Sequence, residues 1–195
     1  MGFKAIARKQ EIVIRPGLAL RRWTLSDATA LFALVEKNRS YLRQWMSWLD
    51  AHTNQSHTRA FLQDCLSGYK SGKSHRWALL ADGEIVGILG LENIELLHRR
   101  AEIGYWISQE HQGSGCVTAA VRAVIDYAFS ERELNLLEIR AATENQKSRA
   151  VAGRVGMTHE GVLREREWLY DHHVDHAIYT LLSSEWILAC TSGDV

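Results

Sequence analysis

The spacing of hydrophobic positions changes from two residues to three or four within residues 103–129. Ile103, Tyr105 and Ile107 occupy every second position, which predicts a strand. A glycine turn, Gln112-Gly113-Ser114-Gly115, follows, and apolar residues from Val117 onward then recur at helical spacing. A helix that starts after glycines presents unpaired N–H groups and the positive end of its dipole. The stretch therefore predicts a strand, a turn that favours a phosphate or pyrophosphate, and a helix.

Other interpretations of glycine motifs in this chain are open at this point. The turn could be an ordinary connection that uses glycine only for its backbone angles. Gly113, Gly115 and Thr118 nearly fit the dinucleotide fingerprint, but that fold begins with this unit, and here about a hundred residues precede it. A second stretch, residues 68–74, is one residue short of a P-loop and follows a helical pattern. We interpret it as a polar helix end.

The same patterns predict the other elements. Before the turn we expect an extended strand over 11–23 broken at Pro16-Gly17, a helix capped by Ser26-Asp27, and helices over 38–50 and 58–69. Strands over 76–81 and 84–91, joined by Asp82-Gly83, and over 98–107 should follow. After the central helix we expect a strand over 134–142, a helix over 145–155, and strands over 157–169 and 174–188. The tryptophan-rich 38–50 segment fits an amphipathic helix, or an aromatic wall over a binding cleft.

This element order predicts the fold class. Antiparallel pairing before and after one βαβ crossover is typical of an α+β fold with a mixed, mostly antiparallel central sheet flanked by helices. Residues 1–195 show no repeat or linker, so we expect a single domain.

Composition narrows the possible partners and the compartment. Hydrophobic residues make up 46% of the chain, enough for a core, and 23 basic residues balance 23 acidic ones. A net charge of zero gives no electrostatic case for nucleic acid or a membrane surface. The N-terminal residues 1–10 do not resemble a signal peptide, and no run approaches the ~18 apolar residues of a membrane span. Three scattered cysteines without metal spacing favour a reducing cytoplasm.

Three segments carry a resemblance to a known family. Residues 101–115, AEIGYWISQEHQGSG, contain Gln112-x-x-Gly115, with Val117 where the family has glycine or alanine. Residues 142–165 contain Asn145-x-x-Ser148 and later Gly156-Met157, and residues 41–50 are YLRQWMSWLD. With these segments the chain resembles the GNAT acyl-CoA N-acyltransferases, and within them the RimJ/RimL-type ribosomal-protein N-acetyltransferases.

The resemblance implies a GNAT fold whose central sheet splays at its middle. It also implies acetyl-CoA as the donor, with no metal, and pantetheine lying between the splayed strands. The implied cofactor-binding residues are Trp106, Ile107, Ser108, Gln112, Gly113, Ser114, Gly115, Cys116, Val117, Thr118, Asn145 and Ser148.

Acetyl transfer to an amine needs a neutral nucleophile and support for the departing thiolate. An α-amine has a pKa of about 7.7–8.0, so roughly a tenth of it is neutral at pH 7 and a weak base suffices. Ser148 is the candidate proton donor to the thiolate, or it only caps its helix. Glu102 is the first candidate base and Glu110 the second, and a salt-bridged surface role is the alternative for both. The His172-His173-His176 cluster could suggest a metal, but a hairpin turn commonly collects such residues.

The acceptor that we expect is a primary amine, most simply the N-terminal α-amine of a ribosomal or other protein. One alternative is an enzyme that acetylates a small amine such as a polyamine, amino acid or antibiotic. The other alternative is a non-catalytic module that only binds acyl-CoA. Seven tryptophans suggest exposed aromatic surface, so we expect a homodimer.

Overall fold

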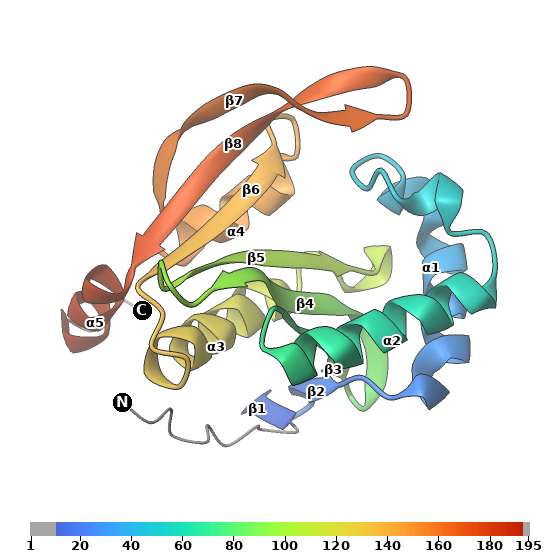
Figure 1. Cartoon of the computed structure of the whole chain (residues 1–195), viewed down its shortest axis with the longest axis horizontal. Helices are drawn as coiled ribbons and strands as arrows, with labels where there is room; N and C mark the ends of the chain where they lie inside the picture. The colour runs from blue at the N-terminus through green and yellow to red at the C-terminus, as the bar shows by residue number, and fades with distance from the viewer. Residues whose placement is uncertain (1–10, 193–195) are drawn as a thin grey trace.

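The computed structural model describes residues 11–192, with side chains to residue 188, and its centre is one eight-stranded sheet (Figure 1). The strand order is β1-β2-β3-β4-β5-β6-β8-β7, and every neighbouring pair is antiparallel except β5 with β6. The strands are β1 (Glu11–Arg15), β2 (Leu18–Arg22), β3 (His75–Ala81), β4 (Glu84–Glu95), β5 (Arg100–Ile107), β6 (Leu136–Ala142), β7 (Thr158–Leu169) and β8 (His172–Leu182). The predicted α+β fold with a mostly antiparallel sheet is confirmed.

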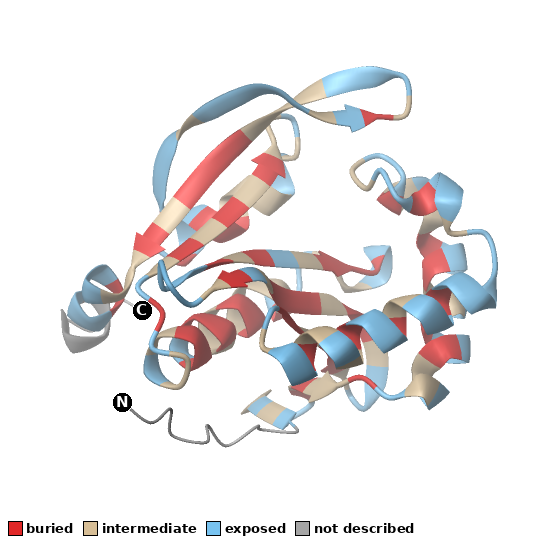
Figure 2. Cartoon of the chain, viewed as in Figure 1, coloured by how far each residue is buried: buried red, intermediate tan, exposed pale blue. Residues whose placement is uncertain are grey.

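Helices cover the two faces of the sheet and divide the core into two parts (Figure 2). One cluster of buried side chains joins the sheet to α3 and α4, and the other joins it to α1 and α2. Trp77 of β3 and Trp106 of β5 belong to different clusters, because alternate strand positions point to opposite faces. The helices are α1 (Ala28–Leu42), α2 (Gln55–Ser71), α3 (Cys116–Ser130), α4 (Gln146–Arg154) and α5 (Ser183–Ser192).

The sheet splays where its one parallel pair ends. Residues 100–102 of β5 pair with residues 136–138 of β6, and past Glu102 and Glu138 no further β5–β6 pairing occurs within the described residues. Each strand keeps its other neighbour: β4 pairs with β5 up to Ile107, and β8 pairs with β6 up to Ala142. The predicted splay is therefore confirmed. Antiparallel pairing of β5 with β4 and of β6 with β8 holds the two separated strands in place.

Two predicted elements were wrong in part. The 38–50 segment is not one helix, because α1 ends at Leu42 and turns lead to a short 3-10 helix at Leu49–Ala51. The strand predicted over 174–188 ends at Leu182, and α5 takes the remaining residues. There Glu185 accepts a hydrogen bond from the backbone N–H of Leu182 at 2.8 Å, which satisfies a donor at the helix start.

The predicted helix cap at Ser26-Asp27 is confirmed at Asp27, which is the N-cap of α1. Asp27, rather than Ser26, takes part in a capping box with Thr24: its carboxylate accepts from the Thr24 backbone N–H at 2.7 Å. Arg21 holds the same carboxylate through two bonds of 2.9 and 3.1 Å. Strand β2 and the first helix are thus tied together at one side chain.

No helix within residues 11–192 is long and apolar enough to cross a membrane. The prediction about a signal peptide concerns residues 1–10, which lie outside the described part of the chain. The cytoplasmic location stays a prediction.

Gly87 of β4 sits where the sheet leaves no room for a side chain. A Cβ there would lie 2.3 Å from the Trp106 carbonyl oxygen and 2.9 Å from the Ile107 Cα, both backbone atoms of β5. We expect Gly87→Ala to destabilise the fold by about 2–3 kcal/mol and to lower the melting temperature by roughly 5–10 °C. Gly104→Ala is the control, since its Cβ would meet only Glu92 Cγ at 3.8 Å. Equal melting temperatures for the two variants would contradict this account.

Candidate active site

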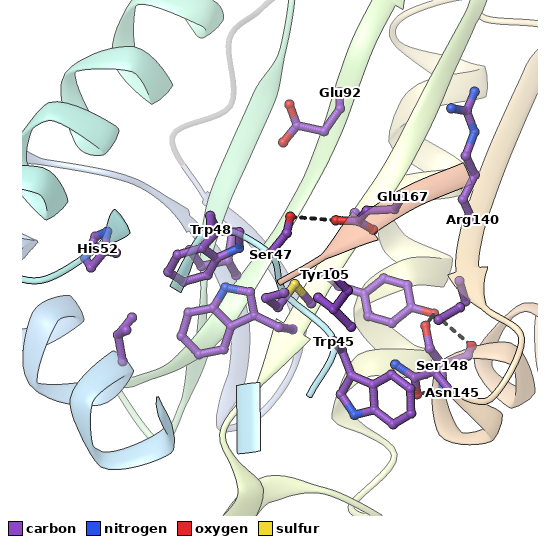
Figure 3. A pocket seen from close by; sticks show the side chains of 18 of the residues that line it. Trp45, Ser47, Trp48, His52, Glu92, Tyr105, Arg140, Asn145, Ser148 and Glu167 are labelled. Carbon is purple, nitrogen blue, oxygen red and sulfur yellow. Dashed lines mark hydrogen bonds between the residues drawn. The ribbon is translucent and has the colours of Figure 1, made fainter. Parts of the chain in front are cut away.

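Two cavities meet in the gap between the splayed strands. The first, of about 660 Å³, is walled by the tryptophans of the α1–α2 connection, and we call it the tryptophan cavity (Figure 3). The second, of about 790 Å³, runs along the turn before α3, and we call it the glycine-turn cavity. Residues that line both cavities mark their junction: Trp45, Met46, Tyr105, Trp106, Asn145 and Ser148.

The glycine-turn cavity is suited to a polyanion. Three cationic side chains line it, those of Arg122, Lys147 and Arg154, and no carboxylate does among the described residues. Gly113 and Gly115 have φ of +73° and +77°, and a Cβ at either would meet nothing within 4 Å. Gly115 caps α3, so the unpaired N–H groups of the first helical turn open into the same space. Backbone donors and fixed cations together fit phosphate groups.

The structure brings most of the predicted cofactor-binding residues to this cavity and leaves two outside its lining. Ser108 is buried, with its hydroxyl hydrogen-bonded to His111 Nδ1 at 2.8 Å and its N–H to the Val86 carbonyl at 2.8 Å. Ser114 donates its hydroxyl to the His111 carbonyl at 2.5 Å. Both serines shape the turn. The lining residues are Trp106, Ile107, Gln112, Gly113, Gly115, Cys116, Val117, Thr118, Asn145 and Ser148.

Asn145, Ser148 and Tyr105 form the polar part of the junction (Figure 3). Asn145 is the N-cap of α4, and its Oδ1 accepts from the Ser148 N–H at 3.1 Å. The Ser148 hydroxyl donates to Tyr105 Oη at 3.0 Å, and Tyr105 donates to the Ser148 carbonyl at 2.9 Å. Burial raises the pKa of Tyr105 to about 12, so this phenol stays protonated at neutral pH.

The tryptophan cavity is mainly apolar, with its charged side chains paired. Arg76 holds Glu92 through two bonds of 2.5 and 2.7 Å. Arg140 lies 3.2 Å from Glu102 and also pairs with Glu138. The apolar walls of the tryptophan cavity are rich in aromatic and aliphatic side chains, among them Leu31, Val35, Trp45, Met46, Trp48 and Phe61. Such a surface accepts a largely neutral ligand.

Glu167 is a lining carboxylate that the sequence did not single out. It lies on β7, and its Oε1 accepts from the Ser47 hydroxyl at 2.6 Å while its Oε2 lies 3.1 Å from His176 Nε2 (Figure 3). The hydrogen bond from His176 is the main reason that the pKa of Glu167 lies below its ordinary value. The carboxylate is therefore ionised at neutral pH and fixed in orientation inside the cavity.

The two glutamates that the sequence favoured lie elsewhere. Glu102 stands at the last β5–β6 pair, where Arg140 and the Asn93 amide, at 3.0 Å, occupy its carboxylate. Glu110 is exposed and forms an ion pair of 2.8 Å with Lys37, which holds the pKa of Glu110 below its ordinary value. Neither side chain lines either cavity.

The histidines of the β7–β8 hairpin are dispersed. His172 pairs with Asp171 at 2.7 Å, His173 packs edge-on against Trp168, and His176 faces Glu167. Among residues 11–188 no group of three or more His, Cys, Asp or Glu side chains is arranged to hold a metal ion.

A roof crosses the tryptophan cavity from the α1–α2 connection to the β7–β8 hairpin. The Tyr170 hydroxyl donates to the Met46 carbonyl, and the Arg43 guanidinium lies 3.8 Å from the centre of the Tyr170 ring. The Ser47–Glu167 bond is the third such link. We call these three links the roof contacts, and they join segments about 120 residues apart in the chain.

A mixed sheet splayed beside a glycine turn, with one cavity suited to a polyanion and another joined to it, fits an enzyme that transfers a group between two substrates. Residues 17–158 match the Acetyltransferase (GNAT) domain family, and the chain belongs to that family. YdaF of Bacillus subtilis (strain 168), named as a candidate ribosomal N-acetyltransferase, is 36% identical over 170 residues, covering 87% of this chain and 93% of that protein.

Two solved structures share the fold over most of both chains. RimL, a ribosomal alpha-N-protein acetyltransferase in complex with coenzyme A, has a TM-score of 0.87 at 28% identity and covers 90% of this chain and 99% of its own. MccE, a microcin C7 self-immunity acetyltransferase in complex with acetyl-CoA and AMP, has a TM-score of 0.86 at 26% identity, with 92% and 99% covered.

These similarities confirm the predicted family and class. The protein is an acetyl-CoA-dependent N-acetyltransferase of the GNAT fold. The glycine-turn cavity has the charge and backbone donors that the phosphates of coenzyme A need.

Gly115 offers a test of the glycine-turn cavity. A glutamate there would place an anion beside the N–H groups of α3, and we expect Gly115→Glu to weaken acetyl-CoA binding more than tenfold, or by over ~1.4 kcal/mol. Gly115→Asn is the control, because asparagine tolerates positive φ without adding charge. Calorimetric affinities that are equal for the two folded variants would show that phosphate does not bind here.

Proposed function

We propose that the protein transfers an acetyl group from acetyl-CoA to the N-terminal α-amine of a ribosomal or other protein. The observation that supports this most is the junction of the two cavities at Tyr105, Asn145 and Ser148. Pantetheine would reach the junction from the glycine-turn cavity, and the acceptor amine would reach it from the tryptophan cavity. RimL, whose name records α-N-protein acetylation, supports the acceptor class by similarity.

The charges of the tryptophan cavity favour a chain terminus over a polyamine. Its lining holds the carboxylates Glu92 and Glu167 and the guanidiniums of Arg76 and Arg140. Within the described lining, each carboxylate already has a protein partner, Arg76 for Glu92 and His176 for Glu167. A second or third ammonium group would lose its water without gaining an anion, which is unfavourable. A peptide terminus brings one ammonium and otherwise neutral groups.

We propose Glu167 as the base that receives the amine proton. Its carboxylate lines the tryptophan cavity, which Ser148 also lines, and it is held by Ser47 and His176, so an amine that enters this cavity meets an oriented acceptor. A carboxylate of lowered pKa is a weak base, but an α-amine of pKa about 7.7–8.0 needs no stronger one. Glu102 and Glu110, the bases expected from the sequence, line neither cavity.

Ser148 is proposed as the hydroxyl that supports the leaving thiolate. It lines both cavities at the start of α4, where pantetheine sulfur and acceptor would meet. Its hydroxyl is a hydrogen-bond donor and its backbone N–H is already taken by Asn145. A donor that contacts sulfur mainly in the transition state raises kcat without tightening the substrate complex.

Acceptor choice is tested by supplying three amines to the enzyme with acetyl-CoA. We expect intact masses of ribosomal proteins to show one added acetyl group, and fragment masses of the products to locate it on the first residue. A short peptide with a free N-terminus should react, and the same peptide with a blocked N-terminus and an internal lysine should not. Spermidine acetylated with a kcat/KM equal to that of the peptide would favour the small-amine alternative. Coenzyme A binding without turnover on any acceptor would favour the binding module.

The base is tested by amide substitution of three glutamates. Glu167→Gln should lower kcat by about 10²–10⁴-fold at pH 7, whereas Glu102→Gln and Glu110→Gln should stay within tenfold of the wild type. The defect in Glu167→Gln should shrink above pH 8, since the α-amine is then mostly neutral before it binds. If Glu102→Gln lowers kcat more than Glu167→Gln does, the base is Glu102, acting from the last β5–β6 pair.

A homodimer is also proposed, through β7. This strand is an edge of the sheet, and Val162, Leu163 and Trp168 on it are each about half exposed, at 47%, 45% and 54%. Exposed apolar residues on an edge strand favour association with a second copy. Light scattering at micromolar concentration should give twice the chain mass of 22.1 kDa. A mass near 22.1 kDa would exclude the dimer under those conditions.

A further inference from the structure

The hydroxyl groups of Tyr105 and Ser148 each donate their hydrogen to the other residue. The Ser148 hydroxyl can support the thiolate only if this pattern of hydrogen bonds changes. The Ser148 carbonyl can only accept, so the 2.9 Å bond to it uses the single hydrogen of the Tyr105 hydroxyl. The 3.0 Å bond between the two hydroxyls must therefore be donated by Ser148. In this arrangement the hydroxyl hydrogen of Ser148 points to Tyr105 Oη, and none is directed to the space between the strands.

Tyr105 is also held more rigidly than a surface tyrosine. Its ring is partly buried against the main core, and it pairs across β4–β5 with Leu89. Its hydroxyl reaches across the splay to the first turn of α4, so two strands and a helix fix the position of Oη. An oxygen fixed in this way selects the side-chain rotamer of Ser148.

We propose that Tyr105 is a positioning residue for Ser148, and that its hydroxyl switches acceptors when the acetyl group leaves sulfur. This inference rests on the proposed role of Ser148. In the switched state Tyr105 donates to Ser148 Oγ instead of to the Ser148 carbonyl. The Ser148 hydrogen is then free to turn to the sulfur, while its oxygen keeps a hydrogen-bond partner. Two rotations about C–O bonds accomplish the change, and no backbone movement is needed.

The step balances without sending a proton through the tyrosine. The N–C bond forms as the C–S bond breaks, the sulfur keeps the electron pair, and the amine proton passes to Glu167 and then to solvent. A thiol has a pKa near 8.5, so the thiolate is a weaker base than a phenolate of pKa about 12. A proton would not remain on sulfur at the expense of Tyr105. The pair therefore supports the thiolate by hydrogen bonding, and sulfur takes its proton from water.

Tyr105→Phe removes the hydroxyl and keeps the ring that fills the core. The matched control is Tyr179→Phe, because Tyr179 is a buried tyrosine whose hydroxyl accepts from Arg149 Nε of α4 at 3.0 Å. Tyr179 contacts the residue after Ser148 and lines neither cavity. Tyr105→Phe removes both hydrogen bonds between its hydroxyl and Ser148, and Tyr179→Phe removes one hydrogen bond to the next residue of the same helix. The comparison therefore separates loss of contact with Ser148 from loss of contact with its neighbour. All rates are measured well below the lower of the two melting temperatures.

We expect Tyr105→Phe to lower kcat about tenfold, the effect of losing the hydrogen bond that positions the Ser148 hydroxyl, with the KM for acetyl-CoA unchanged within about twofold. Tyr179→Phe should leave kcat within about twofold. Ser148→Ala alone should lower kcat by about 10²-fold or more, the usual cost of removing one hydrogen-bond donor to a developing anion. In the Ser148→Ala background, adding Tyr105→Phe should change kcat by less than about twofold, because the group that Tyr105 positions is gone.

The outcomes separate this inference from the proposed function. If Ser148→Ala turns over like the wild type, the hydroxyl role of Ser148 is wrong, and water supports the thiolate. If Ser148→Ala is slow but Tyr105→Phe is normal, Ser148 acts without Tyr105, and only this inference fails. A tenfold loss from Tyr105→Phe in both backgrounds would also overturn it, since the tyrosine would then act by another route.

Discussion

The separation of β5 from β6 is the constraint on which the site depends. Parallel strands normally exchange hydrogen bonds along their whole length, and here the exchange stops after three residues of each strand. The inner edges of both strands past Glu102 and Glu138 then face a gap in which the described residues form no β5–β6 pairs, and backbone groups left without a partner are unfavourable unless water or a ligand satisfies them. Continuous pairing with β4 on one side and β8 on the other keeps the two halves in place. The open edges are what allow a ligand amide to act as a temporary strand neighbour.

Charge is distributed differently on the two sides of this gap. Glu92, Glu102 and Glu138 are in register across β4, β5 and β6, an arrangement of like charges that is destabilising by itself. Arg76 and Arg140 bond to these carboxylates and offset the repulsion. On the side of the tryptophan cavity, the charges of the carboxylates and guanidiniums therefore largely cancel. The described lining of the glycine-turn cavity, by contrast, has cationic side chains and no carboxylate. For the proposed function, this distribution would favour a negatively charged donor and an acceptor without excess charge of either sign.

The sequence predicted those parts of the structure that local patterns determine. The turn at 112–115 was found because glycine, a period of two and a period of three or four adjoin there. Glu167 was missed because it lies on a mostly exposed strand among the charged residues of REREW, and only pairing with β8 brings it beside His176. His176 itself was noticed, but as part of a metal motif. The apolar run that ends β8 looked like strand, and its last residues form α5 because Glu185 and the strand end supply a helix start.

The roof contacts have a topological consequence for whatever enters the tryptophan cavity. Residues of segments 43–48 and 167–170 line this cavity together with residues of the sheet, and the roof contacts join the two segments, so the contacting segments make a closed circuit beside the space. A free end could pass through such a circuit, because nothing lies on its far side, but a loop in the middle of a folded domain would have to enter doubled. For the proposed acceptor, the geometry alone would then separate chain termini from lysines on folded surfaces, before any difference in amine basicity is considered.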